Sequence, residues 1–201
     1  MKGVKNIGLL IVLGLILILG IWGCSGYNGL VKQDEAVKKS WSNVETEYQK
    51  RADLTDQLVK TVQGAADFER NTLQDVIEAR AKATGINVSA DNLTPENIAR
   101  FQEAQGELTG ALNRLMVVVE RYPDLKANQN FLNLQTSLEQ MANGINAAQR
   151  NFNEAVNAYN VKVRSFPTNL FAGMFGFKSR EGFKAEEGAN KAPDVNFDFS
   201  K

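Results

Sequence analysis

The chain has 201 residues, in which 23 Lys and Arg balance 23 Asp and Glu, and it contains no His. A chain with no net charge lacks the electrostatic footprint of a nucleic-acid-binding protein, and the absence of His removes the commonest general base and metal ligand. The single Cys excludes an intramolecular disulfide and a Cys-based zinc site. The composition therefore predicts no cofactor, no metal and no nucleic-acid partner.

Pro occurs only at positions 95, 123, 167 and 193. Because Pro interrupts helices, the Pro-free stretch from residue 1 to residue 94 can be helical through most of its length. Abundant Ala, Gln, Asn, Leu and Glu with 8% aromatic residues agree with a helical domain. We expect an all-α fold, in which an N-terminal transmembrane helix is followed by an elongated antiparallel up-down bundle of three to four long helices.

The N-terminal segment is the first predicted element. No charged side chain occurs between Lys5 and Lys32, and the core of this run, IGLLIVLGLILILGIWG, is almost wholly aliphatic. Roughly 20 apolar residues in a helix cross the hydrocarbon core of a bilayer. Trp22 and Tyr27 stand at the far end of the run, where aromatic rings favour the headgroup level. Residues 1–26 are therefore predicted to be a membrane anchor.

A lipoprotein signal is the alternative interpretation of the same segment. Lys2 and Lys5 would form its basic start, and ILGIWGC resembles a bacterial lipobox, which makes Cys24 a candidate lipidation site. Trp22 is bulky where such boxes carry a small residue, and the apolar run exceeds the roughly 7–15 residues of a signal sequence. We favour an uncleaved signal anchor, and both interpretations attach the protein to a membrane.

The charges on the two sides of the anchor nearly balance. Lys2 and Lys5 precede it, and Lys32, Lys38 and Lys39 follow it, so the positive-inside rule gives close to a tie. Long domains translocate largely regardless of charge, and the lipobox-like ending also points outward. The soluble domain is therefore expected on the extracytoplasmic side.

Residues 27–83 have the pattern of one long helix, which Gly64 is expected to bend only slightly. Its apolar positions are spaced by three or four residues and then continue on a shifted stripe. They are Val37, Trp41, Val44 and Tyr48, followed by Leu54, Leu58 and Val62.

A turn and a second long helix follow. Gly85 suits the end of the first helix, and Thr94 and Pro95 suit the N-cap and the first residue of the next. From Glu96 to about residue 121 the apolar positions again follow helical spacing, and Pro123 ends this helix.

The third long helix, predicted at about 128–165, has the most regular pattern in the chain. Its apolar residues alternate in steps of three and four, and Asn, Gln, Glu, Ser and Arg occupy the positions between them. This heptad pattern is typical of a helix that lies along other helices. One series of apolar positions is Phe131, Leu138, Ile145, Phe152 and Tyr159, and the other is Leu134, Met141, Ala148 and Ala155.

Three long helices with short connections predict an up-down-up course. The first helix would leave the membrane, the second would return and the third would leave again. Pro167 would then lie at the membrane-distal end, because about 38 helical residues advance the chain by about 57 Å. On this topology the Phe residues that follow Pro167 are expected to be too far out to reach the bilayer.

The composition changes after Pro167, and residues 168–201 are predicted to form a Gly/Phe-rich tail behind a bundle of residues 27–167. The tail has two interpretations: its aromatic side chains cover the end of the bundle, or they remain exposed and bind a partner or a membrane. Phe197 and Phe199 lie near its end. The candidate partner-binding residues are Phe171, Phe175, Phe177 and Phe183.

Several blocks of the sequence resemble the LemA family of membrane-anchored bacterial proteins. They are YNGLV at 27–31, KRADLTDQLVKTVQGAADFE at 50–69, YPDLKANQNFLNLQTSLEQ at 122–140, RNFNEAVNAYNVKVRSFP at 150–167 and APDVNF in the tail. The resemblance covers nearly all of the chain after the anchor. It implies a long antiparallel helical bundle behind one anchor, in a family with no established catalytic activity, and it carries over no catalytic residue.

Two functions of different classes follow from the sequence. In the first, the protein is a membrane-tethered, non-enzymatic scaffold or adaptor of the bacterial cell envelope, which binds an envelope protein through its helical face and its tail; homo-oligomers are also compatible with this function. In the second, it is an enzyme with an unfamiliar carboxylate site. The candidate carboxylates are the pairs Asp53/Asp56 and Glu103/Glu107, but each lies among Lys and Arg on a helix, which favours a solvated face. We expect the scaffold.

Overall fold

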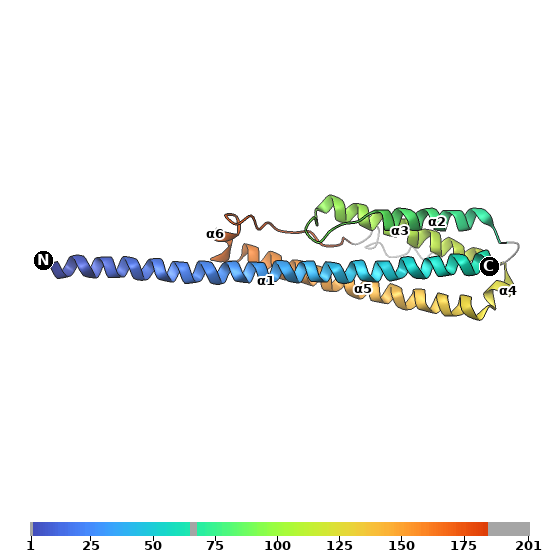
Figure 1. Ribbon diagram of the computed structural model, residues 1–201, viewed down its shortest axis with the longest axis horizontal. Coiled ribbons are helices and arrows are strands. Elements are labelled where there is room, and N and C mark those ends of the chain that lie inside the picture. Colours follow the sequence, from blue (N-terminus) through green and yellow to red (C-terminus); the bar gives the residue numbers. More distant parts are fainter. Residues whose placement is uncertain (1, 65–67, 185–201) are drawn as a thin grey trace, which may run out of the picture.

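The computed structural model describes residues 2–64 and 68–184, with side chains from Leu13 onward except that of Leu19. It is all-α, as predicted, and no β-strand occurs in the described residues. Figure 1 shows an elongated molecule in which one helix, α1, extends far beyond the others. The helices are α1 (Lys2–Gln63), α2 (Arg70–Gly85), α3 (Pro95–Val119), α4 (Pro123–Lys126), α5 (Gln129–Arg164) and α6 (Thr168–Ala172).

The first helix changes character along its length. Its described side chains between Leu13 and Trp22 are apolar and largely exposed, which is typical of a helix that spans a membrane. From Leu30 onward α1 is amphipathic and buries one stripe, which includes Val37 and Trp41, in the bundle. No break separates the two parts, so α1 carries the membrane segment directly into the core of the bundle (Figure 1).

Removal of the membrane segment gives a first prediction. The full-length protein should remain in the membrane pellet after carbonate extraction, whereas a chain that begins at Gly29 should be released, because carbonate strips proteins that do not span the bilayer. If Cys24 is lipidated, acyl labelling should be lost in Cys24→Ser. Recovery of the full-length protein in the soluble fraction would contradict both forms of attachment.

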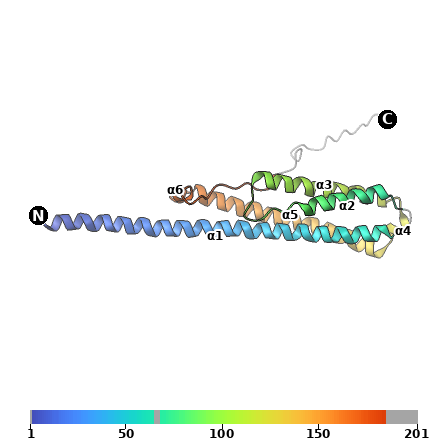
Figure 2. The same cartoon turned by 45° about the horizontal axis from the view of Figure 1, so that its top comes forward.

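The second helix corrects the prediction of one helix over residues 27–83. α1 ends at Gln63, and α2 begins at Arg70 and runs back along α1 (Figures 1 and 2). Gly64 has the weakest helix propensity of any residue except Pro. A second helix also buries more apolar surface when it folds back, because Leu73 and Val76 join the core that α1 and α3 form.

The connection between α2 and α3 agrees with its prediction. α2 ends at Gly85, and Pro95 is the first residue of α3. The Thr94 side chain accepts a hydrogen bond from the backbone N–H of Asn97 at 3.2 Å, which satisfies one of the free donors at the start of the helix. Pro at this position loses no helical hydrogen bond.

The extra reversal changes the direction of every later element. α1 leaves the membrane segment, α2 returns, α3 leads away again, and α5 returns along α1 toward it (Figure 1). The prediction that Pro167 lies at the membrane-distal end is therefore wrong. α6, which follows Pro167, lies beside the part of α1 that emerges from the apolar segment (Figures 1 and 2).

The heptad pattern of α5 is buried to different degrees along the helix. Phe131, Ile145, Phe152 and Tyr159 are buried, whereas Leu138 of the same series is only half-buried. Leu134 and Met141 of the second series are also half-buried. Leu134, Leu138 and Met141 fall in the distal part of α5, which lies along α1 on the side away from α2 and α3 (Figure 1), and Ala155, which is also half-buried, lies nearer the membrane segment.

Candidate functional site

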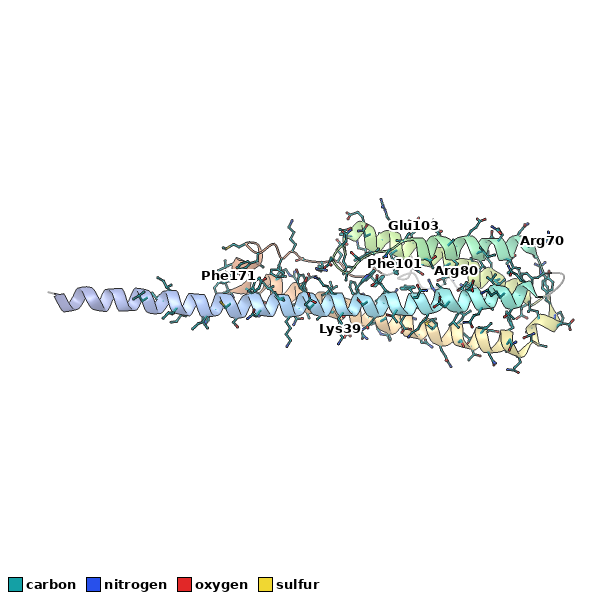
Figure 3. All side chains as sticks on the ribbon, viewed as in Figure 1. Lys39, Arg70, Arg80, Phe101, Glu103 and Phe171 are labelled. Atoms are coloured by element: carbon teal, nitrogen blue, oxygen red, sulfur yellow. The ribbon has the colours of Figure 1, made fainter. Side chains whose placement is uncertain are left out.

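The chain after α5 folds back on the molecule and forms the most distinctive surface of the structure. We call residues 166–175, which include α6, the foot, and residues 177–184 the strap. The foot lies beside α1 at the start of the bundle, and the strap continues from it along the bundle in a direction opposite to α5 (Figure 1). Phe171 is labelled in the foot in Figure 3.

Two Asn side chains of α5 hold the strap. The Asn160 amide accepts from the backbone N–H of Arg180 and donates to the backbone carbonyl of the same residue, both at 2.8 Å. One heptad earlier, Asn153 accepts from the N–H of Phe183 at 2.8 Å and donates to its carbonyl at 3.2 Å. Each amide thereby satisfies both backbone groups of one strap residue, which the strap could not satisfy by itself.

Aromatic packing holds the end of the strap. The Phe183 ring stacks on Trp41 with centroids 5.8 Å apart and meets the edge of Phe152 at 5.5 Å. The Phe177 ring contacts Tyr27 edge-on at 5.9 Å. Phe177 and Phe183 are therefore half-buried against the core, and of the four candidate partner-binding residues they are the two that cover the bundle.

Charged groups close the strap over α1. Arg180 donates to the Asp34 carboxylate at 2.7 Å, and both side chains are largely buried. Lys38 contacts Asp34 at 3.6 Å and Asp91 at 2.7 Å. The hydrogen bond between Lys38 and Asp91 raises the pKa of Lys38 and lowers the pKa of Asp91. The network ties α1, the α2–α3 turn and the strap together.

The other two candidate residues lie in the foot. The Phe171 ring lies next to Gly23 of α1, and the Phe175 ring meets Tyr27 edge-on with centroids 5.0 Å apart. Phe171 is half-buried, but Phe175 remains 53% exposed. The structure thus separates the four Phe residues into two that cover the bundle and two that gather at the emerging end of the membrane segment.

Comparison with known proteins places this architecture in a family. The family model of LemA matches residues 40–197, which include most of the bundle and the strap. The chain belongs to the LemA family. It is 28% identical to magnetosome protein MamQ 2 of Paramagnetospirillum magneticum over 84% of this chain and 68% of that protein. It is 26% identical to protein LemA of Metamycoplasma hominis over 80% of this chain and 69% of that protein.

Family membership and the exposed apolar segment of α1 support the same coarse description. This is a membrane-associated LemA-family protein with one N-terminal helix that is long and apolar enough to span a membrane. Cys24, the candidate lipidation site, is exposed on that helix.

The acidic pairs considered from the sequence do not converge in this LemA-family protein. Asp56 contacts Lys60 at 2.7 Å, and Glu107 contacts Lys82 at 2.6 Å. Glu103 is exposed on α3 (Figure 3). Within the described residues, no group of three or more acidic or Cys side chains could hold a metal ion.

A cavity of about 550 Å³ lies between α1, α2 and α3. Its one carboxylate is Glu45, and burial raises the pKa of this group. Burial also raises the pKa of Tyr48 in the cavity wall. Arg51 donates to Thr109 at 3.0 Å and, at 3.1 Å, to the backbone carbonyl of Gln105, which is a residue of the cavity wall. Sequence analysis did not identify Glu45, because helical spacing alone does not show which polar residues face a cavity.

The two strap-holding amides give a second prediction. Asn153→Ala and Asn160→Ala should each lower the free energy of unfolding by about 1–3 kcal/mol, since each removes two hydrogen bonds worth about 0.5–1.5 kcal/mol. Limited proteolysis should then cleave the strap faster. Asn146→Ala is the matched control, because Asn146 occupies the same heptad position one repeat earlier and is exposed. Equal proteolysis rates in all three variants would contradict the role of the amides.

Glu45 gives a third prediction. The pKa of Glu45 is raised in the folded state, so between its normal and its raised pKa the folded protein binds more protons than the unfolded chain. The free energy of unfolding therefore falls as the pH rises through this range. Glu45→Gln should therefore raise the melting temperature at neutral pH, and the gain should vanish near pH 4. Melting curves at several pH values would measure it, and a gain that is larger in acid would contradict the argument.

Proposed function

We propose that this LemA-family protein is a membrane-tethered, non-enzymatic scaffold or adaptor of the bacterial cell envelope, with its bundle on the extracytoplasmic side. In this function the bundle binds a helical segment of a partner protein. α1 supports the proposal because it holds the bundle on a continuous helix from the membrane segment, without a flexible linker. The surface of the bundle is therefore held at a fixed position relative to the membrane segment of α1.

The observation that carries the proposal is the incompletely covered heptad seam in the distal part of α5. Leu134, Leu138 and Met141 keep heptad spacing but are only half-buried, and neighbouring Leu132 is 39% exposed. Apolar residues at heptad spacing are the surface that another helix covers in a coiled coil. A partner helix laid along α5 would complete their burial.

Site-specific photo-crosslinking in intact membranes tests the proposal. A photoreactive amino acid at Leu132 should form discrete adducts with a partner protein, identified by mass spectrometry. The same amino acid at Ile77 of α2 is the control, because Ile77 is 37% exposed and apolar but lies away from α5. An adduct with a second copy of the chain would mean that this face mediates self-assembly and does not bind a different protein. Equal labelling at Leu132 and Ile77 would contradict a specific binding face on α5.

The tail was the second expected partner-binding surface. The strap supports the bundle through Phe177 and Phe183, which leaves the foot as the part of the described tail with free apolar surface. Phe197 and Phe199 lie outside the described residues.

One observation favours the alternative of an enzyme with a carboxylate site. Glu45 combines a raised pKa with a cavity wall, a combination that is common at catalytic carboxylates. The two functions differ in what Glu45→Gln does to complementation of a deletion strain. An enzyme that uses this carboxylate would lose its function, whereas the scaffold would keep it at unchanged protein abundance.

A further inference from the structure

The foot carries the largest exposed apolar side chains outside the membrane segment. Phe166, Leu170 and Met174 are 78%, 59% and 79% exposed. Leu170 lies in α6, Phe166 lies two residues before this helix, and Met174 lies two residues after it. Phe175, the next residue after Met174, is 53% exposed. Free apolar side chains gathered in this way mark an interaction surface.

The position of the foot identifies what adjoins it. About 20 residues of helix cross the hydrocarbon core, so a span that starts at Asn6 ends near Ser25. Phe171 and Thr168 lie against α1 at Gly23 and Gly26, one on each side of that point. The foot is therefore level with the end of the membrane span, and its apolar surface continues the exposed apolar surface of α1 that ends at Trp22.

Among the described residues, the unpaired charges near the foot are basic, because Asp34 and Asp91, which line a pocket with Phe175, are paired with Arg180 and Lys38. No acidic residue occurs from position 155 to position 180, whereas Lys162, Arg164 and Lys178 flank the apolar residues. Arg180 at the end of this stretch is already paired with Asp34. An apolar surface bordered by Lys and Arg is the composition of segments that lie in the interface of an anionic bilayer.

We propose that the foot is a second membrane contact, in which Phe166, Leu170, Met174 and Phe175 enter the boundary between the headgroups and the acyl chains of the bilayer that α1 spans. The contact goes beyond the scaffold function and does not depend on a protein partner. The protein would then be attached to the bilayer at two places, because α1 crosses the bilayer and the foot lies in the interface on the side where the bundle emerges. The strap then connects this contact to Trp41 in the core.

Depth-dependent fluorescence quenching of the full chain tests the proposal. Cys24→Ser removes the single Cys, and a new Cys at position 174 takes an environment-sensitive fluorophore. The protein is reconstituted in vesicles of phosphatidylcholine and phosphatidylglycerol that contain lipids with a nitroxide high or low on the acyl chain. The fluorophore at Met174 should lose most emission to the shallow nitroxide, less to the deep one, and little to aqueous iodide.

Two matched positions calibrate the measurement. A label at Ile16, which is exposed within the membrane segment, should be quenched most by the deep nitroxide. A label at Val117, which is 72% exposed on α3 near the distal end, should be quenched by iodide alone. A label at Leu170 repeats the test without disturbing Met174, and the helical circular dichroism of each variant must equal that of the parent.

Two results would overturn the proposal. One is quenching of positions 170 and 174 by iodide to the extent seen at Val117, because the foot would then be in water. The other is photo-crosslinking from position 174 in native membranes that gives a protein adduct in place of lipid adducts, because the surface would then bind a protein. Loss of the lipid-side quenching when phosphatidylglycerol is omitted would support the role of Lys162, Arg164 and Lys178.

Discussion

Replacement of Trp41 by Ala is expected to lower the free energy of unfolding by about 3–5 kcal/mol, the usual loss for a large aromatic side chain in a packed core. Trp41 is fully buried on α1, and its ring contacts Phe101 and Phe152 edge-on, each at 5.3 Å, and Phe183 of the strap. Its indole N–H also donates to the Val88 carbonyl at 2.7 Å. The variant therefore leaves a cavity where α1, α3, α5 and the strap meet, together with an unpaired carbonyl.

Denaturant unfolding of the full-length protein in detergent, followed by helical circular dichroism, measures this loss. The chain offers its own control, because its other Trp, Trp22, is 55% exposed at the end of the membrane segment. Trp22→Ala should leave unfolding of the bundle unchanged within about 0.5 kcal/mol. If both variants unfold at the same denaturant concentration as the parent, the result would contradict the close packing described around Trp41.

The second large effect is expected along α5, where two residues of one heptad series should respond differently. Phe152→Ala should cost about 3–5 kcal/mol, because the ring is fully buried between Trp41 and Phe183. Leu138→Ala should cost less than about 2 kcal/mol, because Leu138 is half-buried and the cavity opens to water. The heptad pattern alone predicts comparable losses at the two positions.

The same unfolding measurement applies, with Asn146→Ala on the exposed side of α5 as the neutral reference. A Leu138→Ala loss as large as that of Phe152→Ala would mean that the distal seam is closed in the protein. That result would also remove the surface on which the proposed partner helix binds.

The features that depend on local chemistry could be predicted from the sequence. The charge-free run identified the membrane segment, and heptad spacing identified α5. Thr94 and Pro95 identified the start of α3, where the predicted cap forms. In each case neighbouring residues determine the structure, through helix capping or through the periodicity of apolar side chains.

The reversal after α1 could not be predicted in the same way. Apolar residues keep helical spacing on both sides of Gly64, as Leu58 and Val62 do before it and Leu73 and Val76 do after it. A single Gly costs a helix only about 1 kcal/mol relative to Ala, so the local pattern is compatible with a bend or a break. The burial of Leu73 and Val76 beside α3 favours the break, and that burial is a long-range effect. Because the prediction lacked this one reversal, it placed Pro167 at the membrane-distal end of the molecule.

The strap was missed for a different reason. Asn153 and Asn160 lie on the polar side of the heptad pattern, where Asn normally contacts water. Their seven-residue spacing could have been a signal, but Asn146 has the same spacing and makes no hydrogen bond to residues 177–184 of the described chain. Only the extended backbone of residues 180–183 distinguishes an amide that binds the chain from one that is solvated.

Because α1 is uninterrupted, a tilt of its membrane segment also tilts the bundle that its other half belongs to. From Ser25 to Gln63 the helix extends by about 57 Å at about 1.5 Å per residue. A tilt of about 20°, the average for transmembrane helices, would therefore displace the distal end sideways by about 20 Å. A hydrophobic segment longer than the local hydrocarbon thickness accommodates partly by tilting, so a thinner membrane would displace α4 and the distal seam of α5 sideways together with the end of α1.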